Sequence, residues 1–256
     1  MSVLLITNDD GIHAAGLAAL ADALVELADV WVLAPEREQS ACGHALTLHR
    51  PLRAQPVPGR ERWFAVNGTP SDCVNLGVLG FLPERPVLVA SGINHGSNLG
   101  DDVTYSGTVS AAMEGTLLGV PSIAVSLLND GDLAEAGRVA RLVATRLLVE
   151  GLPGKTLLNV NVPPGTPRGM RVTRLGHRTY SDKIVEQTDP RGRTHYWIGG
   201  GEPEWGDLDG TDMAAVHEGY VALTPVHLDL THHRAVATMA HWSAPLSAQL
   251  RGDHEA

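Results

Sequence analysis

Short apolar runs alternate with helix-patterned segments along most of the chain. Runs of this kind predict buried strands at 3–6, 30–34, 63–66, 87–90, 122–125 and 157–162. Between the first two runs, Leu17, Leu20, Leu24 and Leu27 recur every three or four positions, which is typical of an amphipathic helix. Further helices are expected at 70–78, 108–118 and 134–149. This alternation predicts an α/β protein: a three-layer α/β/α Rossmann-like fold around a mostly parallel sheet.

The residue composition of the chain changes after Pro163-Pro164-Gly165. From 168 to 209 the sequence is rich in Gly, Arg, Asp and Thr and holds only short β-like pieces. Such a stretch cannot supply its own core, so we expect a protruding β-hairpin arm that needs another surface to pack Trp197 and Trp205. A homodimer or homotetramer is therefore expected, formed through the arm and the C-terminal region.

One domain spanning 1–256 is expected, in three parts. These are a Rossmann-like core at 1–165, an arm at 166–210, and C-terminal strand and helix elements at 211–256. The chain has 256 residues, 43% of them apolar and 19% charged, as in ordinary globular proteins. Its formal net charge of −10 argues against binding to duplex nucleic acid or to an anionic membrane.

Cellular location and redox state follow from simpler features. Cys42 and Cys73 form no CxxC pair, and reduced thiols are expected. No basic leader precedes the first strand, and no apolar run reaches about 18 residues. We therefore expect a cytoplasmic protein.

Two adjacent carboxylates, Asp9 and Asp10, follow the first predicted strand. In open α/β sheets, ligands bind in the crevice beyond the carboxyl ends of the strands. Two neighbouring negative charges repel each other, and a shared proton or a divalent cation relieves the repulsion. We take the cation as the working hypothesis.

Two later loops are expected at the same edge of the sheet. Segment 91–102 is rich in Gly, Asn, Ser and Asp, whose oxygen atoms suit Mg²⁺, Mn²⁺ or Ca²⁺. Segment 105–108 then opens a helix. Its free N–H groups, with the hydroxyls of Ser106 and Thr108, would form a seat for a phosphate, and Gly107 would leave room for it.

A cation beside an anion seat suggests phosphoester hydrolysis. The same residues also fit a plain turn at 8–11 and a plain helix cap at 106–108, so spacing alone leaves catalysis open.

Several longer motifs closely resemble the SurE family, the survival-protein-E nucleotidases. The matching segments are Ile6-Thr7-Asn8-Asp9-Asp10-Gly11-Ile12-His13, Gly68-Thr69-Pro70-Ser71-Asp72, Ser91-Gly92-Ile93-Asn94, Asn98-Leu99-Gly100, Tyr105-Ser106-Gly107-Thr108-Val109 and Gly210-Thr211-Asp212. The resemblance implies a metal-dependent phosphatase, or 5'-nucleotidase, acting on nucleoside 5'- and 3'-monophosphates, with short polyphosphate as a further substrate in some members.

The resemblance also implies a site, residue by residue. One divalent metal ion per subunit, Mg²⁺, Mn²⁺ or similar, would be held by Asp9, Asp10, Ser40 and Asn94. Phosphate would be bound by Asn98, Ser106, Gly107 and Thr108, and the catalytic residues would be Asp9, Asp10 and Asn98. Where many members have Ser-Gly, this chain has Ser40-Ala41, and a positive φ would be costly at an alanine.

Two rival functions stay open at this point. A covalent aspartyl-phosphate phosphatase would use Asp9 or Asp10 as nucleophile, although such enzymes usually separate their two aspartates by one residue. A non-catalytic nucleotide-binding or sensing protein would use the same loops without hydrolysis. The group that protonates the leaving oxygen is not evident from the sequence, and His13 is near enough in sequence to be considered.

Overall fold

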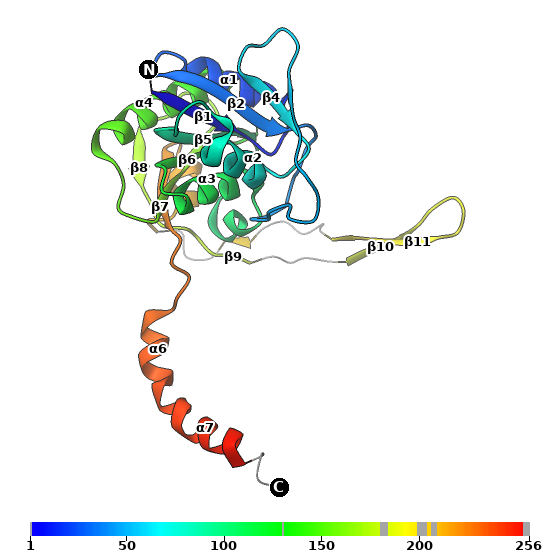
Figure 1. Ribbon diagram of the computed structural model, residues 1–256, viewed down its shortest axis with the longest axis vertical. Helices are drawn as coiled ribbons and strands as arrows, with labels where there is room; N and C mark the ends of the chain where they lie inside the picture. The colour runs from blue at the N-terminus through cyan, green and yellow to red at the C-terminus, as the bar shows by residue number, and fades with distance from the viewer. Residues whose placement is uncertain (1, 130, 180–183, 199–203, 206–208, 253–256) are drawn as a thin grey trace. The chain divides into compact units, whose positions relative to one another are not determined.

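The computed structural model describes residues 2–129, 131–179, 184–198, 204–205 and 209–252. The chain divides into two compact units, Met1–Val226 and His227–Ala256. In the larger unit, helices cover a central sheet (Figure 1). The sheet has nine strands, in the order β3 (Ala54–Pro56), β4 (Trp63–Val66), β2 (Asp29–Pro35), β1 (Val3–Thr7), β5 (Leu88–His95), β6 (Ser122–Leu127), β7 (Thr156–Val162), β13 (Val221–His227) and β8 (Met170–Val172).

Most strand pairs of this sheet are parallel. Parallel pairs are β1 with β2, β1 with β5, β2 with β4, β5 with β6, β6 with β7 and β13 with β8. The short edge strand β3 pairs antiparallel with β4.

Helices pack on both faces of the sheet, as the alternating pattern predicts. The principal helices are α1 (Ala15–Leu24), α2 (Pro70–Leu76), α3 (Gly107–Leu117), α4 (Leu133–Glu150) and α5 (Asp212–His217). Leu4 and Ile6 of β1 share a core cluster with apolar residues of α1 and α4. Val3 and Leu5 instead join a cluster with residues of α2 and α3. Successive side chains of β1 therefore point into two cores, and the three-layer prediction is confirmed.

The strand order reverses at β1. The chain passes from β1 to β2 on one side, and it later returns to place β5 on the other side. The register aligns Leu4 with Val30 and with Leu88, so the three strands end at one edge of the sheet. In α/β folds the crevice at such a reversal is the usual ligand site, and Asp9 and Asp10 follow β1 directly into it.

The expected loop after residue 90 begins later than the pattern predicts. Strand β5 continues to His95, with Ser91 paired to Ala124 and Asn94 to Ser126 across a register shift. Gly and Asn are depleted in strands, so this extension is hard to see in the sequence. Gly92 is required here, because a Cβ at that position would lie 2.2 Å from the carbonyl oxygen of Val125. Asn94 is thus placed by the sheet rather than by a loop.

Two small antiparallel sheets occupy the region predicted as an arm. Strand β10 (Ile184–Thr188) pairs with β11 (Thr194–Ile198), and β9 (Arg178–Thr179) pairs with β12 (Glu204–Trp205). The predicted hairpin is therefore present. Trp197 and Ile198 are 61% and 82% exposed. The side chain of Trp205 lies outside the part that the structure describes.

The smaller unit is helical. It contains α6 (His233–Met239), the 3-10 turn η3 (Ala240–Trp242) and α7 (Ser243–Gly252). Several large apolar side chains of these helices are exposed: Val236, Met239, Trp242, Leu246 and Leu250. Among the described residues of the whole chain, no helix combines the length and apolar character needed to cross a membrane.

Candidate active site

A cavity of about 920 Å³ opens at the carboxyl ends of β1 and β5. Six of the residues predicted from the sequence line it together: Asp9, Asp10, Ser40, Asn94, Asn98 and Ser106. Other lining residues include Glu38, His95, Asp102 and Tyr105. His13 is exposed and is not part of this lining. Segments far apart in the sequence thus place a set of oxygen atoms around one space.

Asp9 is the most deeply buried of these acids, with 5% of its surface exposed. Its Oδ1 accepts a hydrogen bond from the Thr108 hydroxyl, and the backbone N–H groups of Gly107 and Thr108 also stabilise its ionised form. Burial nevertheless raises the pKa of Asp9, because the lost hydration outweighs these donors. A neighbouring cation would restore the lost stabilisation of the charge.

The N–H groups at the helix start at 106–108 have partners within the protein. The N–H of Val109 donates to Ser106 Oγ at 3.1 Å and that of Ser110 to the Ser106 carbonyl at 3.0 Å, while those of Gly107 and Thr108 interact with Asp9. The N–H groups of the first turn of α3 are thus engaged within the protein. The anion at this helix terminus is Asp9 itself. Only the Ser106 side chain faces the cavity from this turn.

Gly107 has a steric role that the sequence did not reveal. A Cβ at this position would lie 2.7 Å from the Cβ of Asp9 and 3.0 Å from Cys42 Sγ. The missing side chain therefore makes room for Asp9, and the phosphate seat expected at this residue stays a prediction.

Asp10 is partly exposed and stands beside Asp9 at the cavity wall. Its Oδ2 accepts from the backbone N–H of His95 at 3.3 Å. Burial raises the pKa of Asp10, and the negative charge of Asp9 raises it further. Within the described residues, no cluster of three or more His, Cys, Asp and Glu side chains forms a metal site. Amide and hydroxyl groups of the lining offer further oxygen atoms beside the two acids.

Asn94 and Ser40 provide such oxygens. Asn94 donates its Nδ2 to the carbonyl of Gly96 at 2.9 Å, which turns Oδ1 toward Thr108 Oγ1 at 3.5 Å. Ser40 Oγ donates to Glu38 at 2.5 Å and keeps its lone pairs for another partner. Two carboxylates, an amide oxygen and a hydroxyl fit a hard divalent cation.

The alanine that departs from the family pattern adopts the conformation that glycine favours. Ala41 has a φ of +55°. The loop that carries Ser40 therefore keeps a left-handed turn at a cost in backbone energy.

Asn98 is held from several sides by residues that sequence reasoning missed. Its N–H donates to Asn161 Oδ1 at 2.9 Å, and its carbonyl accepts from Asn159 Nδ2 at 2.8 Å and from Asn161 Nδ2 at 2.9 Å. Its own Nδ2 donates to Ser126 Oγ at 2.8 Å. The available signal was the Asn-Val-Asn spacing within the strand at 157–162, which puts both amides on one face of β7.

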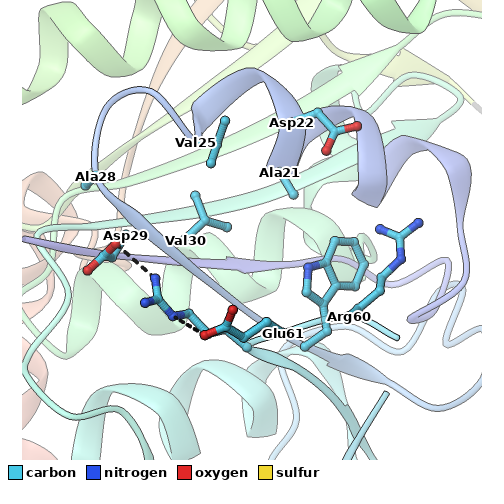
Figure 2. A pocket seen from close by; sticks show the side chains of 10 residues that line it. Ala21, Asp22, Val25, Ala28, Asp29, Val30, Arg60 and Glu61 are labelled. Carbon is cyan, nitrogen blue, oxygen red and sulfur yellow. Dashed lines mark hydrogen bonds and ion pairs between the residues drawn. The ribbon is translucent and has the colours of Figure 1, made fainter. Parts of the chain in front are cut away.

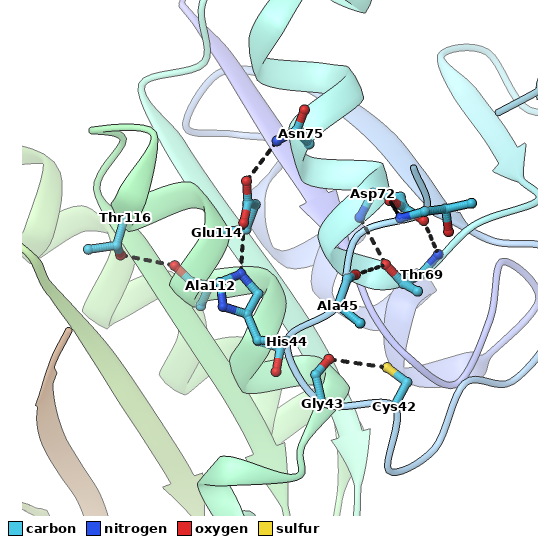
Figure 3. Close-up of polar contacts among 12 residues, drawn as sticks. Cys42, Gly43, His44, Ala45, Thr69, Asp72, Asn75, Ala112, Glu114 and Thr116 are labelled. Atoms are coloured by element: carbon cyan, nitrogen blue, oxygen red, sulfur yellow. Dashed lines mark hydrogen bonds and ion pairs between the residues drawn. The ribbon is translucent and has the colours of Figure 1, made fainter. Parts of the chain in front are cut away.

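The loop that carries Ser40 is tied to two helices (Figure 3). Glu114 of α3 binds His44 Nε2 at 2.7 Å through one carboxylate oxygen and Asn75 Nδ2 of α2 at 2.7 Å through the other. The hydrogen bond from His44 lowers the pKa of Glu114. Three residues beyond His44, the N–H of Thr47 donates to Asp72 at 2.8 Å.

A second hollow, of about 570 Å³, lies at the opposite edge of the sheet, near the amino end of β2 (Figure 2). Its cations already have partners. Arg62 is 2.9 Å from Asp29, and the Arg60 guanidinium lies 4.2 Å above the ring of Trp63. This hollow therefore offers no ready anion site.

These observations define a class: a three-layer α/β protein with an acidic, oxygen-lined cavity at the strand-order reversal. The family model described as Survival protein SurE matches residues 4–182, and the chain belongs to this family. It is 55% identical over 249 residues to the 5'-nucleotidase SurE of Syntrophotalea carbinolica, covering 96% of this chain and 99% of the relative. It is 53% identical to the 5'-nucleotidase SurE of Geotalea daltonii, covering 93% and 98%.

A solved structure shares the fold. The crystal structure of the SurE protein from Aquifex aeolicus matches with a TM-score of 0.84 and 42% identity, over 94% of this chain and 99% of that one. The family named by resemblance from the sequence motifs is therefore confirmed.

Proposed function

We propose that this protein is a metal-dependent 5'-nucleotidase, a phosphoric monoester hydrolase that removes phosphate from nucleoside 5'-monophosphates. Relatives more than 50% identical over almost the whole chain carry the name 5'-nucleotidase SurE. The observation that carries the proposal is the pair Asp9 and Asp10, whose pKa values are raised beside further oxygen donors in one cavity.

The donor set fits one divalent ion per subunit. Asp9, Asp10, Ser40 and Asn94 would hold it. When bound, Mg²⁺ or Mn²⁺ supplies Lewis acidity: it polarises a phosphate oxygen and lowers the pKa of a nearby water molecule.

Two other lining residues, Asn98 and Ser106, would bind and orient the phosphate. Asn98 has a second Nδ2 hydrogen besides the one given to Ser126, and Ser106 can donate its hydroxyl hydrogen while Oγ accepts from Val109. Both groups line the cavity and can donate to phosphoryl oxygens as negative charge builds there. On this proposal one of the two aspartates would take a proton from the attacking water, and Asp10 is the more exposed of the two.

The nucleoside would lie toward Tyr105. This side chain is 64% exposed and lines the same cavity, so its ring offers a face on which any base can stack. Because these contacts favour phosphate and a generic aromatic face, 3'-monophosphates and short polyphosphate fall within the proposed substrate range.

Phosphate release from AMP, measured with and without EDTA, tests the proposal. We expect release to stop with chelator and to return with Mn²⁺ or Mg²⁺. Asp9→Asn and Asp10→Asn should each reduce kcat/KM by at least about 100-fold, while Asp22→Asn, at an exposed position of α1, keeps the wild-type rate. Full activity in either site variant would contradict the assignment.

The same assay separates the rival functions. Nucleotide binding without release would indicate a sensor. A phosphoenzyme trapped by acid quench would indicate a covalent aspartyl route.

We further propose that the protein is a homodimer or homotetramer, joined through the 166–210 arm and the C-terminal region. Exposed apolar side chains support this, including Ile184 at 64%, Trp197 at 61% and Leu246 at 56%. Replacing 184–198 by a short Gly-Ser linker should lower the number of subunits per particle, calculated from the mass that light scattering measures. An unchanged number of subunits would refute a role of the arm in assembly.

A further inference from the structure

Asp212 is a fully buried carboxylate outside the cavity that none of the steps above uses. It is the first residue of α5 and is 0% exposed. Its Oδ2 accepts from the N–H of Gly100 at 2.8 Å. Its Oδ1 accepts from the N–H groups of Gly176 at 2.9 Å and of Met213 at 3.0 Å. One side chain therefore joins three parts of the chain: the segment 98–106, called the site segment below, the residues just before β9, and α5.

The site segment between Asn98 and Ser106 is held at both ends and also between them. Asn98 is bound to β7 at one end, Ser106 begins α3 at the other, and the Tyr105 carbonyl accepts from the N–H of Gly43 at 3.1 Å. Between them, Gly100 opens the 3-10 turn η2 (Gly100–Thr104). Leu99 packs in a small apolar cluster with Met213 and neighbours around α5. The bond from Gly100 to Asp212 thus sets the path of the chain that connects two phosphate-facing residues.

Close packing limits the alternatives to this arrangement. Gly100 has a φ of +54°, and a Cβ there would lie 2.7 Å from the carbonyl oxygen of Gly176. The two backbones are therefore in contact, and neither can shift far while Asp212 binds both. At Gly176 a Cβ would lie 3.3 Å from Met213 Sδ and 3.4 Å from Asp212 Oδ1, so this glycine also lies close against the carboxylate.

The bonds of Asp212 reach three separate segments. One carboxylate accepts from N–H groups of Gly100, Gly176 and Met213, so a change in this side chain alters the contact between all three. Burial raises the pKa of Asp212, and the N–H donors act in the opposite direction.

We propose that Asp212 is a positioning residue of the phosphate site, which fixes Gly100 and with it the path of the segment that leads from Asn98 to Ser106. Asp212 is not among the residues that line the cavity. Its kinetic consequence rests on the proposed nucleotidase function, whereas its structural consequence does not.

Kinetics of substituted protein provide the first test. In Asp212→Asn the amide group cannot accept at both ends, so one of the two glycine N–H bonds is lost. We expect kcat/KM for AMP to fall by about 10-fold to 100-fold, with most of the change in KM. The affinity for Mn²⁺ should stay within about twofold, because the proposed ligands are held by other bonds.

Matched variants separate positioning from general destabilisation. Gly100→Ala should reproduce the Asp212→Asn effect, while Gly154→Ala, where a Cβ meets nothing within 4 Å, should keep wild-type kinetics. Val143→Ala, a core truncation in α4, should lower Tm without raising KM. If Val143→Ala raised KM as much as Asp212→Asn, the positioning role would be overturned.

Hydrogen exchange provides a test that depends on neither activity nor a stable variant. In the wild-type protein, the amides of Gly100 and Gly176 should exchange as slowly as core amides of β5. Asp212→Asn should accelerate exchange around these two glycines and leave α4 unchanged. Exchange at exposed-loop rates in the wild type would overturn the proposal, even if AMP hydrolysis were normal. If the protein hydrolysed no nucleotide, the nucleotidase proposal would fail. Slow exchange would still support the clamp, by which we mean the hydrogen bonds of Gly100 and Gly176 to Asp212.

Discussion

Gly107 lies against Asp9, and this contact makes it sensitive to the smallest substitution. In Gly107→Ala the new Cβ would meet Asp9 at 2.7–2.8 Å and displace its carboxylate. We expect the affinity for Mn²⁺ to fall by about 10-fold to 100-fold, as for other changes that disturb a ligand's support. Isothermal titration measures this directly. Gly154→Ala, where a Cβ meets nothing within 4 Å, is the matched control.

This experiment also distinguishes the two explanations for Gly107. If Gly107→Ala raised the Kd for inorganic phosphate but left metal affinity intact, the steric argument through Asp9 would be wrong. A phosphate seat at the helix terminus would then regain support.

A substitution at Ala41 is expected to raise stability and metal affinity rather than lower them. An L-residue in the left-handed region costs roughly 1–2 kcal/mol, and the greater freedom of glycine in the unfolded chain offsets about 0.5–1 kcal/mol of the gain. Ala41→Gly should therefore stabilise the protein slightly and ease the Ser40 loop into place, lowering the metal Kd. Lys155→Gly, at a φ of +57° outside the cavity lining, should raise Tm similarly with no effect on metal binding. Equal metal affinities in the two variants would contradict the idea that strain at Ala41 weakens metal binding by the Ser40 loop.

At the scale of elements, Glu114 joins α3, α2 and the loop of Ser40. Its folded pKa lies below its ordinary value, so its contribution to stability is present at neutral pH and is lost as the pH falls through the folded pKa. Glu114→Gln should therefore destabilise the protein at pH 7 more than at acidic pH. Thermal melts across pH 3–7 check this expectation. A pH-independent loss would show that the charge of Glu114 is not what matters.

Local signals in the sequence were enough for many of these elements. Val3 to Ile6 is too short and apolar for anything but a buried strand, and Thr69 with Pro70 marks a helix start. The structure confirms that start, since Thr69 and Asp72 form a reciprocal capping box. The placement of Asp9 and Asp10 at one edge followed from the same strand pattern.

Long-range partners set the limit of such prediction. Asn161 of β7 reads in the sequence as part of an apolar strand, yet its side chain fixes the backbone of Asn98, 63 positions earlier. Asp212 likewise looks like an ordinary helix-start acid, because its partners Gly100 and Gly176 are distant in the chain. Nor does the sequence show that Asp9 packs against the start of α3.

For the molecule as a whole, the acid pair links stability to metal and pH. The pKa values of Asp9 and Asp10 in the folded protein lie above the ordinary value for aspartate. Without metal, the two acids therefore contribute stability to the fold at a pH below the ordinary value, and this contribution is lost as the pH rises through the folded pKa values. A cation that binds the ionised pair reverses the loss. The Tm gain from Mn²⁺ should therefore be small near pH 4 and large near pH 7.

Scanning fluorimetry with EDTA and with Mn²⁺ measures this gain. It should vanish in Asp9→Asn and Asp10→Asn. A gain that is the same at both pH values, or that persists in these variants, would place the ion elsewhere.

The distance along the chain between Gly100 and its partner has a consequence for synthesis. Asp212 is made 112 residues after Gly100. At translation rates of about 5–20 residues per second, that interval lasts roughly 6 to 22 seconds. Throughout it, the nascent chain already carries both acids and Asn94 but lacks the clamp on its phosphate segment. On our proposal the growing chain is a poor hydrolase of cellular nucleotides, and full activity arrives only after the segment that carries Asp212 has been made.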